Sequence, residues 1–305
     1  MASDSGVGID TLKAFLKENP DFKVYDFSSV ELADQCLRKY KYRYIDHVED
    51  KTGIEAAFSN YIIHPALGAS YEKPYSEFVK QCADAKWWQP LWKNFQNSGV
   101  RPVTSKQERA YRLEVAQRII RVFSDSYPSE FELYKLIGVE LVYWRVLPGL
   151  KNAVWVAKPD LMITRRVDDL PMSGEIKVST WDFNRNLNVM DRQILSQAWA
   201  TGVKWQMKIF CQIVMDRNEF YEVRINREIK QPEDSLMAEW LDEIQFSVGV
   251  LQDAAASDIW PKRAPRSCHD FNKPCAFIDI CPLGNAKDLI LDNMPKSNPW
   301  KYLGL

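Results

Sequence analysis

The sequence lacks several features that would place it in well-known classes of protein. It has no apolar run long enough to cross a bilayer, and its first residues lack the basic region and apolar run of a secretory signal. It has no internal repeat and no low-complexity segment. It also has no GxxxxGK[ST] loop, so no ATP motor of the P-loop type is visible. We therefore expect an intracellular protein, cytoplasmic or (in a eukaryote) nuclear or organellar, without a membrane partner.

The chain also lacks an excess of charge of either sign. Its 305 residues include 40 basic and 41 acidic side chains, which gives a formal net charge of -1. This balance argues against a polycationic tail but not against a local basic channel, because binding depends on where charges cluster. The hydrophobic fraction of 46% is ordinary for a folded protein, and no long linker divides the chain. We expect a single domain over 1–305.

Segments with helical and strand character alternate along the chain. Helical patterns dominate the first part, including 28–64, and a strand-rich block with one helix inside it covers 137–226. A long amphipathic helix and a cysteine-rich segment, 268–281, follow. Strands packed between helices indicate an α/β fold with a central mixed β-sheet flanked by helices.

The tripeptide Glu-Ile-Lys occurs twice, and its first copy lies next to another acidic residue. Side chains alternate between the faces of a strand, so Glu175 and Lys177 share one face while Ile176 points into a core. The preceding strand carries Asp160 and joins this one through a turn, which lets the two carboxylates approach. Paired carboxylates repel unless a cation lies between them, so the pattern favours Mg²⁺ or Mn²⁺. Lys177 could stabilise phosphate charge or orient a water, and a structural ion pair is the alternative.

The second copy, Glu228 and Lys230, has no such partner. It follows a strand and runs into a turn-like segment, QPEDS. We interpret these two residues as part of a solvated loop.

A Pro-Asp pair, a turn and a Glu-x-Lys on the next strand resemble the PD-(D/E)XK nuclease superfamily, and the flanking segments resemble its RecB-like branch. Members of that branch carry a histidine in a helix before the strands, and His64 in HPAL is the matching position, with a core histidine as the alternative. They also carry a glutamine in the helix after the Glu-x-Lys strand, where Gln197 is the better match and Gln193 the weaker. Glu140 is expected on the strand before that of Asp160, where related nucleases often have an acidic residue, and an exposed strand glutamate is the alternative.

The resemblance implies a restriction-endonuclease-like core and a metal-dependent deoxyribonuclease. The implied metal ligands are His64, Asp160 and Glu175, and the implied catalytic residues are Asp160, Glu175, Lys177 and Gln197. The implied substrate is DNA, single-stranded or with free ends, cut by an exonuclease in recombination, repair or phage DNA processing, beside a separate helicase or recombinase. The alternatives are a non-catalytic DNA-binding member of the same fold and a structure-specific endonuclease.

Three cysteines lie close together near the end of the sequence, at Cys268, Cys275 and Cys281. Three thiols cannot complete a four-ligand site. Cys36, in CLRKYKYRYI, resembles the position from which many RecB-like nucleases contribute the first ligand of a [4Fe–4S] cluster. The resemblance therefore implies a cluster that joins the N- and C-terminal segments. The spacing C-x6-C is longer than in that family, which keeps Zn²⁺ open, with Cys36 or His269 as the fourth ligand.

Basic and aromatic residues alternate directly after Cys36. The basic residues that could contact DNA phosphates are Arg38, Lys39, Lys41 and Arg43. A solvated helix face is the alternative interpretation.

Overall fold

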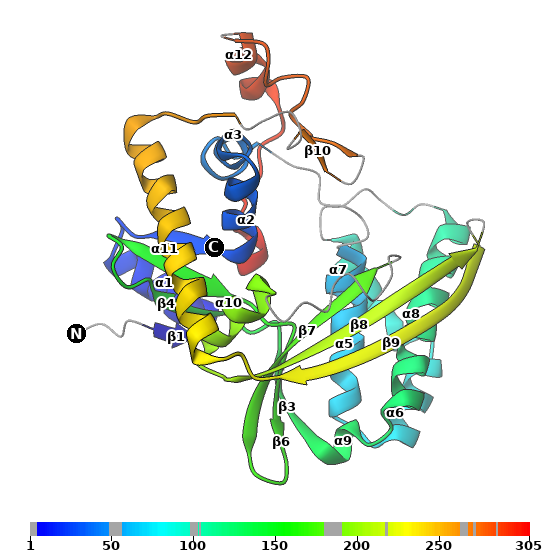
Figure 1. The fold of residues 1–305 in the computed structure, drawn as a ribbon. Helices are drawn as coiled ribbons and strands as arrows, with labels where there is room; N and C mark the ends of the chain where they lie inside the picture. The colour runs from blue at the N-terminus through cyan, green and yellow to red at the C-terminus, as the bar shows by residue number, and fades with distance from the viewer. Residues whose placement is uncertain are drawn as a thin grey trace. The chain divides into compact units, whose positions relative to one another are not determined.

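The computed structural model describes residues 5–48, 57–97, 103, 105–179, 191–216, 219–262, 268–270, 273–284 and 286–305. Two mixed β-sheets with flanking helices confirm the expected α/β fold class (Figure 1). No helix among the described residues is long and apolar enough to cross a membrane.

The chain forms two compact units, each assembled from separate stretches of sequence. Unit 1 comprises Met1–Lys51, Val142–Ala157 and Asp234–Leu305, and unit 2 comprises Thr52–Leu141 and Lys158–Glu233. The single nuclease domain expected over 1–305, with 137–226 as its core, stays a prediction.

Unit 2 is built on a five-stranded sheet in the order β3-β6-β7-β8-β9. Its strands are β3 (Tyr134–Val139), β6 (Leu161–Arg165), β7 (Leu170–Ser179), β8 (Trp205–Asp216) and β9 (Glu219–Lys230). Neighbouring strands are antiparallel except β7 and β8, which are parallel. A parallel pair needs a crossover connection, and helix α10 (Arg192–Thr201) supplies it.

Helices cover both faces of this sheet. Ile176 of β7 and Ile209 of β8 belong to a hydrophobic core shared with Ile119 of helix α8. Because side chains alternate, Glu175 points to the opposite face, toward α10, where Gln197 donates a hydrogen bond to it. The helices on the core side of unit 2 are η2 (Ser59–Ile63), α5 (His64–Gly68), η3 (Ala69–Tyr71), α6 (Tyr75–Ala83), α7 (Trp88–Gln96), α8 (Lys106–Ser126) and α9 (Glu130–Leu133).

Unit 1 contains a four-stranded sheet in the order β1-β4-β5-β2, in which only β2 and β5 are parallel. Its strands are β1 (Ser5–Val7), β2 (Lys23–Asp26), β4 (Tyr143–Val146) and β5 (Ala153–Ala157), with the short pair β10 (His269–Asp270) and β11 (Lys273–Pro274). Its helices are α1 (Ile9–Glu18), α2 (Phe27–Gln35), α3 (Leu37–Tyr40), η1 (Lys41–Ile45), α11 (Asp234–Ser257), α12 (Ala286–Asn293) and η6 (Lys301–Leu303).

The helix expected around Cys36 is interrupted at that residue. Cys36 has an extended backbone, with φ -167° and ψ 113°, and separates α2 from α3. Its N–H still donates to Leu32 O at 2.9 Å, so it ends one helix and precedes the next. The interruption gives the Cys36 side chain a direction that an unbroken helix would not allow.

The turn between β6 and β7 lies near the start of the turn-like sequence VDDLPMSG. Pro171 belongs to that stretch, but it pairs with Thr164 inside the strand ladder. The pairing of β7 with β8 begins only at Met172, so the missing N–H of Pro171 is tolerated. Residues 166–169 form the turn, and Asp169 has the left-handed φ of 52° that a tight connection needs.

The second Glu-Ile-Lys copy lies in a strand rather than in the loop that the sequence predicted. β9 continues to Lys230, with Glu228 opposite Lys208 of β8. Oppositely charged cross-strand neighbours favour this pairing, which the local turn-like sequence did not reveal.

Candidate active site

Two strands of unit 2 bring the acidic residues together. In the antiparallel pair of β6 and β7, Leu161 lies opposite Gly174, so Asp160 and Glu175 occupy the next position of the ladder. Asp160 Oδ2 accepts a hydrogen bond of 2.7 Å from the backbone N–H of Ile176. Both carboxylates are buried, and the Asp160 charge contributes to the raised pKa of Glu175. The approach expected from the hairpin is therefore present.

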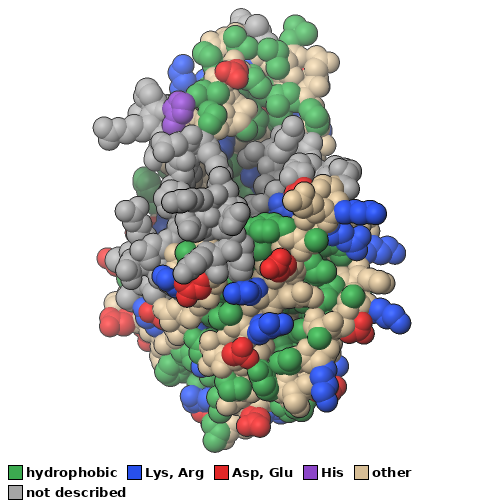
Figure 2. Space-filling view, turned by 90° about the vertical axis from the view of Figure 1, so that its right-hand side faces the viewer, with side chains coloured by type: hydrophobic (Ala, Val, Ile, Leu, Met, Phe, Trp, Pro, Cys, Tyr) green, Lys and Arg blue, Asp and Glu red, His purple; other side chains and the backbone are tan. Residues whose placement is uncertain are grey.

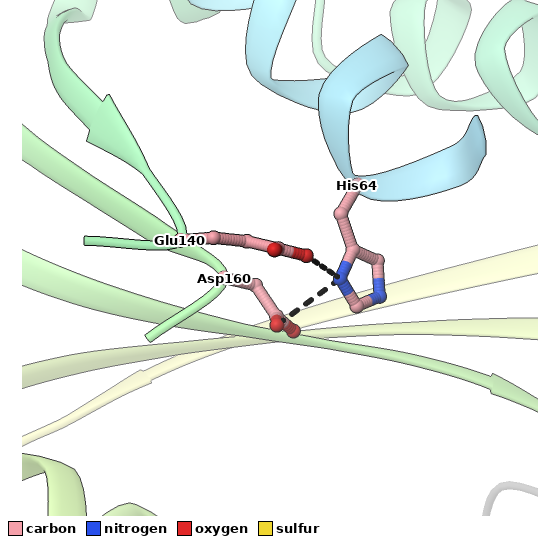
Figure 3. A group of neighbouring side chains, drawn as sticks. All are labelled: His64, Glu140 and Asp160. Carbon is pink, nitrogen blue, oxygen red and sulfur yellow. Dashed lines mark ion pairs between the residues drawn. The ribbon is translucent and has the colours of Figure 1, made fainter. Parts of the chain in front are cut away.

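His64 and two carboxylates form a compact group of potential metal ligands (Figure 3). One ligand atom from each of His64, Glu140 and Asp160 lies within 4.8 Å of the other two. His64 Nδ1 is 3.1 Å from Asp160 Oδ1 and 3.6 Å from Glu140 Oε1. The imidazole comes from the start of α5, while Glu140 directly follows β3 and Asp160 directly precedes β6. These three elements converge at one end of the sheet.

The surroundings of His64 orient its ring toward the two acids. Ser59 Oγ, in the preceding helical turn, lies 2.9 Å from His64 Nε2. His64 Nδ1 is buried and has no hydrogen-bond partner of normal geometry within the described structure. A buried imidazole nitrogen that faces two carboxylate oxygens fits a divalent cation held by three ligands.

Glu140 reaches this position through an uncommon backbone conformation. Its φ is 52°, in the left-handed region, which costs a glutamate roughly 1 kcal/mol or more. Its N–H donates to Asp160 O at 3.2 Å, which ties the turn to the strand that carries Asp160. The far carboxylate oxygen, Oε2, accepts a hydrogen bond of 2.8 Å from Lys158 Nζ. These two contacts therefore fix both the backbone and the carboxylate of Glu140.

The charges of this group shift the pKa of two of its members. Burial alone would lower the pKa of His64, but the Asp160 and Glu140 carboxylates raise it to about 9. Burial alone would raise the pKa of Glu140, but His64 and Lys158 lower it overall. Without a metal the imidazole is therefore protonated at neutral pH, and a cation that binds Nδ1 must replace that proton.

Glu175 is held by a second set of contacts, from β7 and α10. Lys177 Nζ lies 2.5 Å from Glu175 Oε1, and Gln193 Nε2 donates to the same oxygen at 2.7 Å. Gln197 Nε2 donates to Glu175 Oε2 at 2.5 Å. Lys177 Nζ also donates to Gln193 Oε1 at 2.6 Å. Gln193, the weaker match in the sequence, thus contacts both members of the Glu-x-Lys pair, whereas Gln197 contacts only Glu175 of that pair.

In the Glu175–Lys177 ion pair the carboxylate is buried, whereas the lysine side chain is 38% exposed. Burial and the Asp160 charge raise the pKa of Glu175, while Lys177 opposes them. Burial alone would lower the pKa of Lys177, but Glu175, Asp160 and Asp191 raise it overall. Asp191 caps α10 and forms an ion pair with Lys208. Lys177 is therefore a charged hydrogen-bond donor at neutral pH rather than a base.

The second Glu-Ile-Lys copy forms only a local ion pair. Lys230 Nζ lies 2.8 Å from Glu228 Oε2, and both side chains are partly exposed. Neither residue belongs to the His64, Glu140 and Asp160 group. The two copies therefore differ in the burial of the glutamate, which is 4% exposed at Glu175 and 29% exposed at Glu228, and in their neighbours.

The four cysteines expected to hold a cluster all belong to unit 1. Cys275 N–H donates to Cys268 O at 2.8 Å, and Arg38 Nη1 donates to Cys281 Sγ at 3.6 Å. Burial raises the pKa of the Cys275 thiol, and the nearby Cys268 and Cys36 thiols raise it further. Cys268 and Cys36 thus lie close enough to Cys275 to affect its thiol, and Arg38 of α3 contacts the fourth cysteine.

These thiols do not form a closed site for a single ion. Among the described residues, no three of their sulfur atoms lie within 4.8 Å of one another, whereas four thiolates around one Zn²⁺ lie ~4 Å apart. A [4Fe–4S] cluster spreads its thiolates around a larger core. The geometry supports a divalent-cation site in unit 2, while the metal of the cysteine segment stays a prediction.

The four basic residues that follow Cys36 are half-buried within unit 1. Lys41 Nζ pairs with Asp46 Oδ1 at 3.0 Å, and Arg38 Nε donates to Trp260 O at 3.2 Å. On the face shown in Figure 2, acidic and basic side chains are interspersed, in keeping with the nearly neutral composition. A role of Arg38, Lys39, Lys41 and Arg43 in DNA binding stays a prediction.

Comparison with known proteins gives little further information. No family model matches the chain, and no curated protein matches it. A solved structure described as "Crystal structure of SSO0001" has 16% sequence identity and a TM-score of 0.34, over 82% of this chain and 93% of the other. An exonuclease, LHK-Exo, solved in complex with dAMP, has 14% identity and a TM-score of 0.26, over 64% of this chain and 94% of the other. Likeness at this level does not assign a function, which has to be argued from the site.

Proposed function

We propose that this chain is a metal-dependent deoxyribonuclease of the PD-(D/E)XK type. The observation that carries the proposal is that the His64, Glu140 and Asp160 group lies beside the Glu175–Lys177 ion pair, with Asp160 hydrogen-bonded to the backbone of β7. Carboxylate oxygens and an imidazole nitrogen are ligands that Mg²⁺ and Mn²⁺ accept. A charged lysine beside such a group suits the hydrolysis of a phosphodiester.

Each residue has a distinct part in this proposal. His64 and Asp160 would hold the cation, with Glu140 or Glu175 as a further ligand. A divalent cation at this position supplies Lewis-acid stabilisation of the phosphate and acidifies a bound water. Lys177 would donate a hydrogen bond to the phosphate or to the attacking water. Gln193 and Gln197, which both bond Glu175, keep the carboxylate in one orientation.

The charges of the site also bear on how a phosphate could bind. The negative charges come from Asp160, Glu140 and Glu175, and a divalent cation adds positive charge beside them. We therefore expect a bound cation to strengthen the binding of the nucleic acid. The resemblance to RecB-like nucleases supports DNA with single-stranded segments or free ends as the substrate, processed beside a separate helicase or recombinase.

The cysteines of unit 1 would form a second metal centre. Cys36, Cys268, Cys275 and Cys281 would hold a [4Fe–4S] cluster, with Zn²⁺ as the alternative. What supports this is the resemblance of the Cys36 segment and the closeness of Cys268 and Cys36 to Cys275, whose thiol pKa they raise. Such a centre would attach residues 268–281 to α3 and would have a structural role.

Digestion of end-labelled linear and circular single-stranded DNA, with Mg²⁺, Mn²⁺ or EDTA, tests the proposal. Asp160→Asn should abolish cleavage, because it removes a charged ligand. The matched control is Asp168→Asn, which changes an exposed aspartate in the turn after β6 and should cut like the parent. Loss of activity in both variants, or in neither, would contradict the assignment of the Asp160 group as the active site.

The substrates separate the alternatives. Cleavage of linear but not circular DNA indicates an exonuclease, and cleavage of both indicates an endonuclease. Metal-independent DNA binding without cleavage of any substrate would identify the chain as a non-catalytic DNA-binding protein. Comparison with an RNA substrate of the same sequence shows whether the chain prefers DNA or RNA.

A further inference from the structure

Lys158 provides a fixed positive charge at the metal-ligand group. Lys158 Nζ lies 2.8 Å from Glu140 Oε2, while the other oxygen of the same carboxylate faces His64 Nδ1 at 3.6 Å. Lys158 is only 18% exposed and Glu140 25% exposed, so the pair is shielded from solvent much more than a surface salt bridge. Glu140 therefore lies between the Lys158 ammonium group and the His64 imidazole.

The position of Lys158 follows from its place in the chain. It lies two residues before Asp160, in the short connection between β5 and β6. The N–H of Glu140 is bonded to the backbone of Asp160, which brings the Glu140 turn next to this segment. The ammonium group is thus positioned by the same backbone that positions Asp160.

The charges limit how many divalent cations the site can hold. Glu140, Asp160 and Glu175 contribute three negative charges, and Lys158 and Lys177 contribute two positive ones. With His64 neutral, these side chains together have a net charge of -1. One divalent cation, with a charge of +2, already more than balances it. A second divalent cation bridged to the first by Glu140 would need the outer oxygen of this carboxylate, which already accepts a hydrogen bond from Lys158.

We propose that Lys158 takes the place of a second divalent cation at Glu140, so that this site binds one metal ion rather than two. The inference rests on the proposed metal-dependent nuclease and specifies its metal stoichiometry. Lys158 acts through Glu140 as a positioning residue: it neutralises the carboxylate that would otherwise complete a second cation site. Such two-metal sites hold their ions about 4 Å apart.

Mn²⁺ titration of the full chain without DNA tests the proposal. Mn²⁺ prefers oxygen and imidazole ligands, so the cysteines of unit 1 do not compete for it. Isothermal titration calorimetry should give one Mn²⁺ per chain for the parent and two for Lys158→Met, which keeps an apolar stem but removes the charge. Lys158→Arg should restore one ion. Lys135→Met, which removes an exposed lysine of the same unit, should leave one ion and an unchanged affinity.

Electron paramagnetic resonance provides an independent readout. The parent should give the spectrum of an isolated Mn²⁺, and Lys158→Met should give that of two coupled ions. If Lys158→Met does not fold, Lys158→Gln offers a neutral side chain that can still donate to Glu140.

The outcomes distinguish this inference from the proposed function. Two ions in the parent, or one ion of unchanged affinity in the neutral variants, would overturn the role of Lys158 while leaving the nuclease intact. A parent that binds no Mn²⁺ would overturn the metal site itself, and the inference with it.

Discussion

The backbone N–H of Ile176 donates a hydrogen bond of 2.7 Å to the carboxylate of Asp160. This contact fixes Asp160 against the strand whose side chains on one face are Glu175 and Lys177, while Ile176 packs into the core on the other face. Packing on one side of β7 therefore positions the acidic group on the other side.

The two Glu-Ile-Lys copies should differ in function. Lys177→Ala removes a charged donor from the site and should lower kcat by about 10²–10³-fold, with little loss of folding or DNA binding. Lys230→Ala removes a partly exposed lysine from the end of β9 and should cut nearly as fast as the parent. Steady-state kinetics on one DNA substrate compares the two. An equal effect in both variants would contradict the assignment.

The metal-free protein should lose stability at alkaline pH because of His64. The folded-state pKa is about 9, above the ordinary value of 6.5, so the stabilisation by the charged imidazole is complete below about pH 6.5 and lost as the pH rises through 9. The difference in unfolding free energy between the parent and His64→Gln should therefore fall by on the order of 3 kcal/mol across this range. Urea unfolding in EDTA measures it.

His47→Gln, which alters an exposed histidine of unit 1, is the control and should show no such trend. Metal affinity should change in the opposite sense, because a bound cation replaces the proton of His64. The affinity should rise about tenfold per pH unit up to pH 9. A pH-independent affinity would mean that His64 is not a ligand.

The two glutamines of α10 should have separable effects. Gln193 bonds both Glu175 and Lys177, so Gln193→Ala should lower kcat by roughly tenfold or more with a small change in stability. Gln197 is fully buried, so Gln197→Ala should destabilise the fold by about 1–3 kcal/mol in addition to lowering kcat. Thermal unfolding and kinetics on the same preparations separate the two. A larger loss of kcat in Gln197→Ala than in Gln193→Ala would favour Gln197 as the main positioning residue.

The cysteine centre should be visible in anaerobically purified protein. A [4Fe–4S] cluster gives a brown colour with a broad absorption near ~400 nm, and Cys36→Ser should remove it as completely as Cys281→Ser does. Cys82→Ser and Cys211→Ser are controls, because burial raises the pKa of each of these thiols to about 12 and both lie in unit 2. Both should keep the colour. A colourless protein with stoichiometric zinc would contradict the iron–sulfur assignment.

Much of the site was predictable from the sequence because it depends on short-range geometry. The period of two along a strand places Glu175 and Lys177 on one face, and a short turn brings Asp160 to their side. The contacts of Gln193 with Glu175 and Lys177 depend on where α10 lies against the sheet, which a local pattern does not specify.

The errors in the sequence-based fold have a common physical origin. Pro171 and the Glu228–Lys230 segment have local sequences typical of turns, yet both lie in strands because neighbouring strands pair with them. The interruption at Cys36 is equally invisible in a pattern that is helical on both sides. Tertiary pairing overrides local preference at Pro171 and in the Glu228–Lys230 segment.

The division of the chain between the two units determines the order in which a ribosome can complete them. The chain leaves unit 2 after Leu141, returns at Lys158 and finishes that unit at Glu233. Unit 1 still needs Asp234–Leu305, while its two central strands, β4 and β5, are already synthesised. The residues from His64 to Gln197 can therefore assemble during synthesis before Cys268, Cys275 and Cys281 emerge. Because each unit is made of separate stretches of sequence, truncation of the chain at any one position cannot yield one complete unit without part of the other.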